Sequence, residues 1–424
     1  MRKLILIPLF FLLTACEQSQ QVPVVQTPTE TKTEVIHEAI DITGLWRGVL
    51  TSPGGELPFG IDITQNNDIY SAKIINGEEL VDTSSVIFEN NQLVINIEWF
   101  DAKLEAALNE DGVFMGQWSK TASGKDKSSS LLFTATREYS HRFEQEKATA
   151  QGASVAGNWE VTFSDEDGDS IAVAEFKQNG QIVSGTFLTP TGDYRYLSGV
   201  ANDGKLYLSA FDGAHAFLFD ALIGEDTMTS GNFWSRESYH ATWKATKSDN
   251  TAEFLPNSWE MTKSTNPVAF AFNDTQGQLI QLTDERFKDK PVVINLFGTW
   301  CPNCNDEAPL LAKIYDKYNQ QGLEVVGLAF EFTEDPERDT QQLKFFKKRH
   351  GINYPLLLAG GNDKTEATKI LGFLDKVKSY PTTIFLDRTH QVVNIHTGFS
   401  GPGTGEHYLK LVEELEQEII GLLN

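Results

Sequence analysis

The chain of 424 residues is long enough for two or three domains, and its 40% hydrophobic content is sufficient for globular cores. Its formal net charge of −24 argues against binding to nucleic acid and against electrostatic attachment to anionic lipid, because both partners are themselves negative. An acidic, soluble surface is the simpler interpretation. The three cysteines are too few for a disulfide-stapled protein, so each is expected to have a separate role.

The chain begins with the order of residues typical of a bacterial secretion signal. Met1-Arg2-Lys3 is basic, and Leu4 to Leu13 is mostly apolar but too short to cross a bilayer. Leu13-Thr14-Ala15-Cys16 then places small residues before a cysteine, which predicts a signal peptide over residues 1–15. This end resembles the lipobox of bacterial lipoproteins, and the resemblance implies that Cys16 becomes the diacylated first residue of the mature protein. An ordinary signal peptide followed by a chance cysteine is the alternative.

Residues 16–40 are rich in Gln, Thr, Val, Pro and Glu and have almost no hydrophobic periodicity, so we expect a disordered tether. A lipid on Cys16 would anchor this tether to a membrane and leave the rest of the chain facing the periplasm. In lipoproteins of Gram-negative bacteria, Glu17 in place of an aspartate favours the outer membrane over the inner one.

Residues 41–137 and 153–250 look like two copies of one β-rich unit. Short runs of alternating polarity, such as Phe59 to Ile63, are separated by turn signals, such as Asp203-Gly204. These patterns predict seven or eight antiparallel strands in each copy, closed as a barrel or packed as a sandwich. Four segments recur at offsets between 110 and 116 residues: Gly44-Leu45-Trp46 as Gly157-Asn158-Trp159, Trp99-Phe100-Asp101 as Ala210-Phe211-Asp212, Gly116-Gln117-Trp118-Ser119 as Gly231-Asn232-Phe233-Trp234-Ser235, and Phe133-Thr134-Ala135-Thr136-Arg137 as Trp243-Lys244-Ala245-Thr246-Lys247.

Each copy opens with a Gly-x-Trp sequence, which faintly resembles lipocalin-like and avidin-like barrels. Tryptophans at corresponding places in such units usually close the bottom of the core. We therefore predict core positions rather than ligand contacts for Trp46, Trp118, Trp159 and Trp234.

From residue 264 to residue 424 the pattern changes to alternating strands and helices. The order of a central strand, helix and strand, then a further helix and a closing antiparallel pair of strands, is that of thioredoxin. The expected elements are a hairpin over 270–282, a strand over 291–297, a helix over about 301–320, a strand over 323–330, a helix over 336–350, a strand over 354–358, a helix over 366–373, strands over 382–386 and 392–396, and a closing helix over 406–423.

Two cysteines stand where the strand over 291–297 gives way to the following helix. Cys301 falls near the N-cap, and Pro302 falls near the first helical position, where its missing N–H costs nothing. Unpaired backbone N–H groups and the helix dipole favour an anion at this end. The thiol of Cys301 should therefore have a lowered pKa and act as a nucleophile, with Cys304 one helical turn further on.

The stretch around the cysteines reads Trp300-Cys301-Pro302-Asn303-Cys304, followed by Glu307-Ala308-Pro309. It resembles the W-C-x-x-C-x-x-E-x-P signature of the thioredoxin-like disulfide reductases of the TlpA/ResA type, which are related to AhpC/TSA redoxins. The resemblance covers about residues 264–424. It implies a thioredoxin fold and the reduction of disulfides outside the cytoplasm. Asn303 departs from the pattern, because the family often has Pro, His or Tyr there.

The resemblance also implies a role for each residue of the site. Cys301 attacks a substrate disulfide as the thiolate, and Cys304 resolves the mixed disulfide, so that no cofactor beyond this pair is needed. Glu307 tunes the cysteine pKa values and carries a proton to or from Cys304, although an acid in the first helical turn also stabilises a helix. Tyr380-Pro381 matches the cis-proline loop that faces the cysteines; a trans proline beginning a strand is the alternative. Trp300, Pro302 and Tyr380 are the expected substrate-contacting residues.

The sequence therefore favours an extracytoplasmic thiol-disulfide oxidoreductase whose partners are disulfide-containing periplasmic proteins and an upstream membrane thiol donor. A redoxin-type thiol peroxidase is a second possibility, and a ligand- or partner-binding lipoprotein with an accessory redox domain is a third. A half zinc site at Cys301 and Cys304 is disfavoured, because zinc would need two more soft ligands and the only other cysteine is Cys16. We therefore expect no metal.

Overall fold

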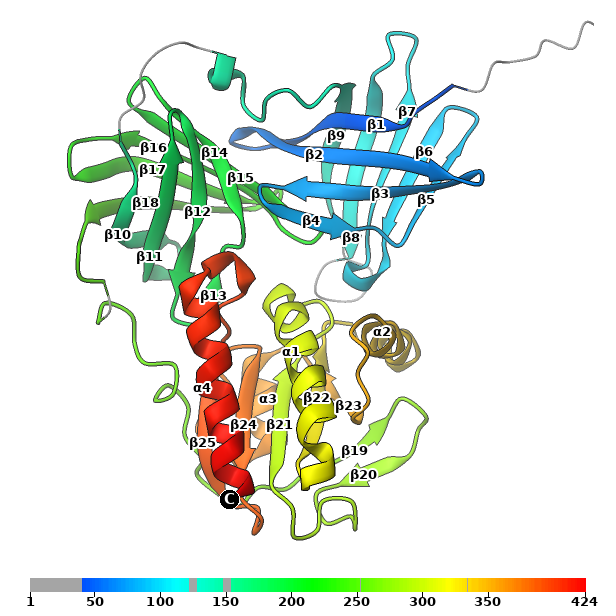
Figure 1. The fold of residues 1–424 in the computed structure, drawn as a ribbon, viewed down its shortest axis with the longest axis vertical. Helices are drawn as coiled ribbons and strands as arrows, with labels where there is room; N and C mark the ends of the chain where they lie inside the picture. Colours follow the sequence, from blue (N-terminus) through cyan, green and yellow to red (C-terminus); the bar gives the residue numbers. More distant parts are fainter. Residues whose placement is uncertain (1–39, 122–127, 148–153, 252, 334) are drawn as a thin grey trace, which may run out of the picture. The chain divides into compact units, whose positions relative to one another are not determined.

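The computed structural model describes residues 40–121, 128–147, 154–251, 253–333 and 335–424 (Figure 1). The predicted signal peptide over residues 1–15, the predicted lipidation site at Cys16 and all but the last residue of the tether predicted over 16–40 lie outside the described residues. All of the strands and helices below belong to one compact unit, residues 42–424, which is the second compact unit of the chain.

The first β unit is a closed antiparallel barrel of eight strands. The ring runs β1-β2-β3-β5-β6-β7-β8-β9 and closes because β1 pairs with both β2 and β9. A short extra strand, β4, pairs with β3 outside the ring. The strands are β1 (Gly44–Ser52), β2 (Gly55–Asn66), β3 (Ile69–Asn76), β4 (Glu79–Asp82), β5 (Ser85–Glu89), β6 (Gln92–Ile97), β7 (Ala102–Leu108), β8 (Phe114–Thr121) and β9 (Ser128–Arg137).

The second β unit has the same strand order. The ring runs β10-β11-β12-β14-β15-β16-β17-β18, closes through the pairing of β10 with β18, and carries the short extra strand β13 on β12. The predicted antiparallel strands are therefore confirmed, and each unit is a barrel. The strands are β10 (Gly157–Asp165), β11 (Gly168–Asn179), β12 (Ile182–Thr189), β13 (Gly192–Asp193), β14 (Leu197–Asn202), β15 (Lys205–Phe211), β16 (Ala216–Ile223), β17 (Thr227–Ser235) and β18 (Tyr239–Lys247).

Three of the four tryptophans predicted in the barrel cores are there. Trp46 and Trp159 are each buried, and each donates from its indole Nε1 to the carbonyl oxygen four residues earlier, at 2.9 and 2.8 Å. Trp118 is also fully buried. The prediction for Trp234 is wrong. Side chains of a strand alternate between the two faces, and Phe233 takes the inward position in β17, so the partly exposed Trp234 points outward and packs against the core of the first barrel.

Aromatic side chains fill the interior of the second barrel. The rings of Phe219 and Phe233 stack with their centroids 4.3 Å apart, and Phe187 stacks on Phe219 at 4.9 Å. An eight-stranded barrel has an interior just wide enough for side chains to fill. A ligand of the lipocalin kind would have to displace these rings, so the packing speaks against the ligand-capture interpretation of this barrel.

The C-terminal part of the chain is a thioredoxin-like domain with a seven-stranded sheet in the order β20-β19-β23-β22-β21-β24-β25. The pairs β21–β22 and β22–β23 are parallel, and the other pairs are antiparallel. The order predicted from the sequence is confirmed. The elements are β19 (Ala271–Asp274), β20 (Leu279–Gln281), β21 (Val292–Phe297), α1 (Pro302–Tyr318), β22 (Glu324–Glu331), α2 (Pro336–Arg349), β23 (Leu356–Gly361), α3 (Lys364–Leu371), β24 (Thr382–Leu386), β25 (Val392–Thr397) and α4 (Glu406–Leu423).

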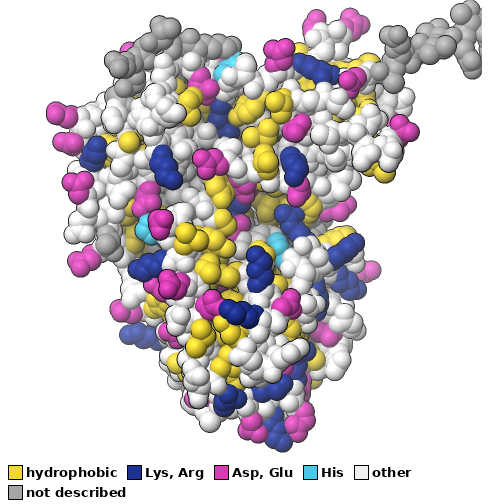
Figure 2. Space-filling view, viewed as in Figure 1, with side chains coloured by type: hydrophobic (Ala, Val, Ile, Leu, Met, Phe, Trp, Pro, Cys, Tyr) yellow, Lys and Arg dark blue, Asp and Glu magenta, His cyan; other side chains and the backbone are white. Residues whose placement is uncertain are grey.

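The helices of this domain are amphipathic and cover the sheet (Figure 1). The strand β21 is buried along its whole length, as its apolar, β-branched sequence predicts, while α4 buries only a stripe of side chains at helical spacing, Leu411, Leu415, Ile419 and Leu422. None of the helices in the described part of the chain combines the length and the apolar character needed to cross a bilayer. On the face shown in Figure 2, acidic and basic side chains are intermingled.

Side chains join the two barrels and the C-terminal domain within the second compact unit. Phe211 of the second barrel packs on Phe59 of the first with ring centroids 4.3 Å apart. The guanidinium of Arg349, at the end of α2, lies 3.5 Å from the ring centroid of Trp99, and Arg338 of α2 pairs with Asp101. The loop between β6 and β7 of the first barrel therefore packs on α2 of the C-terminal domain.

Candidate functional site

Cys301 and Cys304 form a disulfide at the junction of β21 and α1. Cys301 is the N-cap residue, and its Sγ accepts a hydrogen bond from the backbone N–H of Cys304 at 3.2 Å. Both residues are buried, with exposed fractions of 5% and 2%. The positive end of the helix dipole and this N–H group stabilise a thiolate on Cys301 once the disulfide is reduced. The sequence prediction of a cysteine pair at the start of a helix agrees with this geometry.

Three of the residues expected to contact substrate surround the disulfide. The carbonyl oxygen of Tyr380 lies 3.5 Å from Cys301 Sγ, and the Tyr380–Pro381 peptide bond is cis, the form that the family resemblance implies. The ring of Trp300 packs edge-on against Tyr380 at 5.9 Å, and its Nε1 donates to the carbonyl oxygen of Phe330 at 2.9 Å. Pro302, partly exposed, begins α1.

Glu307 is a buried carboxyl group on the active-site helix, with only 1% of its surface exposed. Its two oxygens accept hydrogen bonds from Asn295 Nδ2 and Thr383 Oγ1, each at 2.7 Å. Burial raises the pKa of Glu307 to about 7, and these two hydrogen bonds oppose the rise. A carboxyl group with this pKa changes its protonation near neutral pH, which is what a proton carrier to a thiol requires.

A second buried carboxyl group, which the sequence reasoning missed, supports the residues before the cysteines. Glu331 ends β22 and accepts hydrogen bonds from Thr299, from the backbone N–H at 2.8 Å and from Oγ1 at 2.7 Å. Burial raises the pKa of Glu331 to about 7. By holding Thr299, Glu331 positions the backbone that leads into Trp300 and Cys301. An acid that directly follows the apolar run from Val325 to Phe330 was the available signal in the sequence.

A histidine also belongs to the surroundings of the site, although the sequence assigned none there. Asn305 donates from Nδ2 to the carbonyl oxygens of Thr299 and Cys301, each at 3.0 Å, and its Oδ1 lies 3.0 Å from Nε2 of His350. Burial, with Arg349 nearby, lowers the pKa of His350 to about 3, so the ring is neutral and donates to Asn305. These contacts fix the backbone around Cys301.

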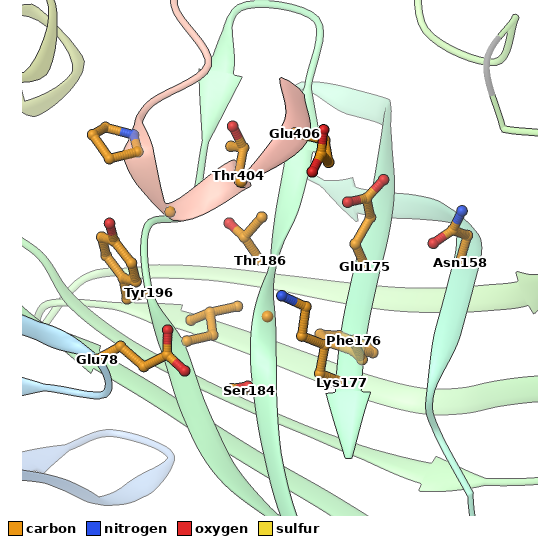
Figure 3. Close-up of a pocket in the computed structure, with 15 residues that line it drawn as sticks. Glu78, Asn158, Glu175, Phe176, Lys177, Ser184, Thr186, Tyr196, Thr404 and Glu406 are labelled. Atoms are coloured by element: carbon orange, nitrogen blue, oxygen red, sulfur yellow. The ribbon is translucent and has the colours of Figure 1, made fainter. Parts of the chain in front are cut away.

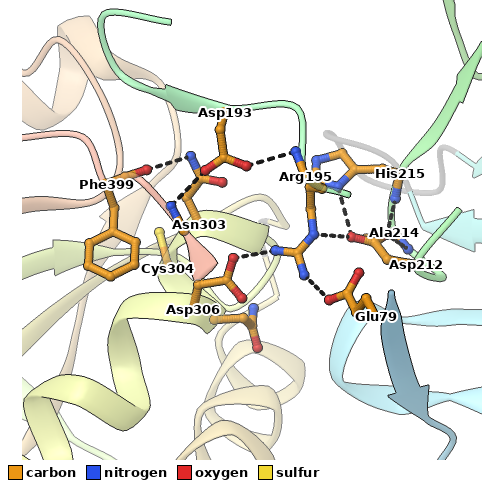
Figure 4. Close-up of polar contacts among 12 residues, drawn as sticks. Glu79, Asp193, Arg195, Asp212, Ala214, His215, Asn303, Cys304, Asp306 and Phe399 are labelled. Atoms are coloured by element: carbon orange, nitrogen blue, oxygen red, sulfur yellow. Dashed lines mark hydrogen bonds and ion pairs between the residues drawn. The ribbon is translucent and has the colours of Figure 1, made fainter. Parts of the chain in front are cut away.

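The remaining face of the first turn of α1 carries Asn303 and Asp306. Asn303 donates from Nδ2 to the carbonyl oxygen of Phe399 at 3.3 Å. Asp306 lies near the start of α1, where the helix dipole favours an acid, and it also forms an ion pair with Arg195 of the second barrel (Figure 4). This pairing joins residues 111 positions apart and has no local signal in the sequence.

The cavity drawn in Figure 3 is separate from the cysteine pair. It has a volume of about 280 Å³ and lies between the second barrel and residues 402–406. Its lining combines the carboxylates of Glu78, Glu175 and Glu406 with Lys177 and contains neither cysteine, so it is not the redox site. Among the residues that the structure describes, no cluster of three His, Cys, Asp or Glu side chains is arranged to hold a metal ion.

Residues 265–395 match the AhpC/TSA family. The chain is also similar to proteins named thiol-disulfide oxidoreductase ResA. The one from Bacillus anthracis is 30% identical over 143 residues, which are 34% of this chain and 74% of the relative. The one from Bacillus subtilis strain 168 is 30% identical over 144 residues, 34% of this chain and 72% of the relative. Among solved structures, a thiol:disulfide interchange protein of the thioredoxin family from Chlorobium tepidum TLS is 22% identical, covers 35% of this chain and 97% of its own, and has a TM-score of 0.27.

Proposed function

We propose, from the premise that this chain belongs to the ResA-type thiol-disulfide oxidoreductases, that it reduces protein disulfides outside the cytoplasm through Cys301 and Cys304. The observation that carries the proposal is the disulfide at the N-terminus of α1, between the cis Tyr380–Pro381 bond and the buried Glu307. With dithiothreitol as the electron donor, the purified protein should reduce the disulfides of insulin. Failure of the reduced protein to reduce both insulin and the small disulfide of oxidised glutathione would contradict the proposal.

The reaction transfers two electrons from the reduced cysteine pair to the substrate. The Cys301 thiolate attacks one sulfur of the substrate disulfide, forms a mixed disulfide and releases the other substrate sulfur as a thiolate, which takes up a proton. Cys304 then loses its proton and attacks the Sγ of Cys301. The Cys301–Cys304 disulfide forms, and the second substrate thiol leaves. A thiol donor must reduce the pair again before the next cycle, and the pair requires no further cofactor.

Glu307 is the residue to which we assign the proton of Cys304. It lies three residues after Cys304 on the same side of α1, and its burial keeps bulk water from competing for the proton. Its carboxylate form accepts the proton during the second attack and returns it when the pair is reduced. The backbone edge beside the cis Tyr380–Pro381 bond faces Cys301, where an extended stretch of the substrate would pair with it.

Replacing Glu307 with glutamine should remove one step from the pH dependence of disulfide exchange. Because the pKa of Glu307 is about 7, its carboxylate becomes populated as the pH rises from 6 to 8, so the wild-type rate should rise with an inflection near pH 7. In Glu307→Gln this inflection should be lost, and the rate at pH 8 should fall about a hundredfold. Stopped-flow measurement of the second step gives both values, and an unchanged profile would limit Glu307 to a structural role.

The location of the protein rests on residues outside the described part of the chain. We infer that Cys16 is acylated and holds the protein on a membrane facing the periplasm, with the outer membrane favoured by Glu17. Its partners would then be disulfide-containing periplasmic proteins and an upstream membrane thiol donor.

The Cys16→Ser variant tests this location. It should be released from the membrane fraction or remain unprocessed, while the wild type stays with the membrane. A single acyl chain gives only marginal binding, so more than one chain on the residue is needed for a stable anchor. Recovery of wild-type protein wholly in the soluble periplasmic fraction would rule out the anchor.

A further inference from the structure

Residues 189–196 of the second barrel, which include β13, lie directly against the redox site. The backbone N–H of Gly401 donates to Asp193 Oδ2 at 2.7 Å. A Cβ atom placed on Gly398 would come within 2.5 Å of the carbonyl oxygen of Thr191, and one placed on Gly192 would overlap Asn303 Nδ2. The contact at Gly398 is with backbone atoms, so a side chain does not fit there, whereas at Gly192 a side chain would require the end of Asn303 to move aside.

Arg195 holds this segment in place through three carboxylates (Figure 4). Its guanidinium, only 7% exposed, pairs with Asp306 of α1, with Glu79 of the first barrel, and through Nε with Asp212 of the second barrel at 2.9 Å. Asp212 is further bonded to Nδ1 of His215 at 3.0 Å. The planar, multiply donating guanidinium suits such a site, whereas a lysine ammonium could not make the same set of bonds.

The backbone conformation of Arg195 indicates that this contact has a functional role. Its φ angle is 63°, in the left-handed region that a long side chain seldom adopts. The Arg195 N–H donates to Asp193 Oδ1 at 2.7 Å, which ties the unusual backbone to the same residue that binds Gly401. Such conformations persist where the surrounding contacts over-determine them, and they are concentrated at functional sites.

The segment covers one side of the cysteine pair. Asn303 and Asp306, three residues apart on α1, share a face of the helix, and both are occupied by residues 189–196. Trp300, Pro302, Asn303 and Asp306 are all partly exposed, but the contacts of Trp300 are with Phe330, Phe332 and Tyr380 of its own domain. Resting on the function proposed above, we propose that residues 189–196 are a specificity-determining wall of the redox site, which admits a substrate disulfide only from the side of Trp300 and Pro302 and disfavours bulky folded partners.

The wall should lower kcat/KM more for a large substrate than for a small one. A small disulfide reaches Cys301 while the wall is in place, but a folded protein has to bind the fraction of molecules in which residues 189–196 have moved away. The kcat/KM for a bulky substrate then scales with that fraction, while the value for a small one does not. Removing one charged hydrogen bond of Arg195 should raise the open fraction about tenfold.

The test compares Asp306→Asn with Asp316→Asn in the full-length protein. Asp306→Asn removes the charge that binds Arg195 from α1 but leaves Arg195 with its two other carboxylates. Asp316 is on the same helix, is exposed, and accepts a hydrogen bond from Asn353 of the same domain, so it is the matched control. Reduction of insulin and of glutathione disulfide, each with dithiothreitol as donor, gives the ratio of the two kcat/KM values.

We expect the ratio of kcat/KM for insulin to kcat/KM for glutathione disulfide to rise about tenfold in Asp306→Asn. In Asp316→Asn this ratio should keep the wild-type value. The assays belong at pH 8, where Asp306 is charged, because burial raises its pKa to about 7 and Arg195 opposes the rise. Asp193→Asn weakens the hydrogen bond from the Gly401 N–H on the other side of the contact, so it should also raise the ratio. This variant provides the test if Asp306→Asn does not fold. An unchanged or lower ratio in both variants, with both disulfides still reduced, overturns the wall alone. A wild-type protein that reduces neither disulfide overturns the proposed function as well.

Discussion

A variant with Cys304 replaced by serine should accumulate covalent complexes with its substrates. Cys301 would still attack a substrate disulfide from the N-cap of α1, but the mixed disulfide could not be resolved, so turnover should fall to the background rate. Non-reducing gel electrophoresis of cells that express the variant should show new high-mass bands. Mass spectrometry of these bands would identify the natural partners directly.

The converse variant, Cys301→Ser, is the matched control and should trap nothing. Cys304 lies inside the first turn of the helix, whereas Cys301 caps it, so we expect Cys301 to meet a substrate first. Trapping by Cys301→Ser alone would reverse the two roles. If neither variant traps a partner but Cys304→Ser still consumes peroxide, the thiol peroxidase alternative replaces the reductase.

Replacing Arg195 with methionine should strongly destabilise the protein. Methionine retains much of the apolar stem but leaves the carboxylates of Glu79, Asp212 and Asp306 without their shared cation in a buried place. Removing one partner from a buried ion pair costs about 3–5 kcal/mol. Chemical denaturation, monitored by tryptophan fluorescence, should show this loss in the free energy of unfolding.

The matched control for this change is Lys73→Met in the first barrel. Lys73 pairs with Asp82, but their side chains are 51% and 72% exposed, so water screens the pair and its removal should leave the free energy of unfolding nearly unchanged. A loss in Arg195→Met as small as that of the control would mean that the three carboxylates are solvated or protonated. It would then also remove the charge basis of the wall formed by residues 189–196.

Much of the C-terminal domain could be predicted because its signals are local. The cysteine pair, Pro302 and Glu307 lie within one stretch of chain, and the apolar strand before them leads directly into an amphipathic helix. The bounds of α4 and β24 coincide with the prediction, whereas β23 begins at Leu356, two residues later than expected, because strand ends depend on pairing with neighbouring strands.

In the β units, the sequence is informative about strands and turns but not about which face a side chain takes. Asp203 and Gly204 adopt φ angles of 50° and 70°, as the turn signal requires. A side chain's face depends on its exact place in an alternation of period two, so a shift of one residue reverses inside and outside. For this reason the sequence predicts a core position for Trp234, although the core in fact holds Phe233.

The chemistry of this protein can be inferred from its sequence, because the spacing of Cys301, Cys304 and the motif around them indicates thiol-disulfide exchange. The surroundings of that chemistry depend on contacts between distant parts of the chain. The closure of each barrel joins its first strand to its last, and the pairing of Arg195 with Asp306 joins residues 111 positions apart. Such contacts are selected by the packing and charge balance of the whole fold, since a buried cation is stable only where the folded chain brings carboxylates to it.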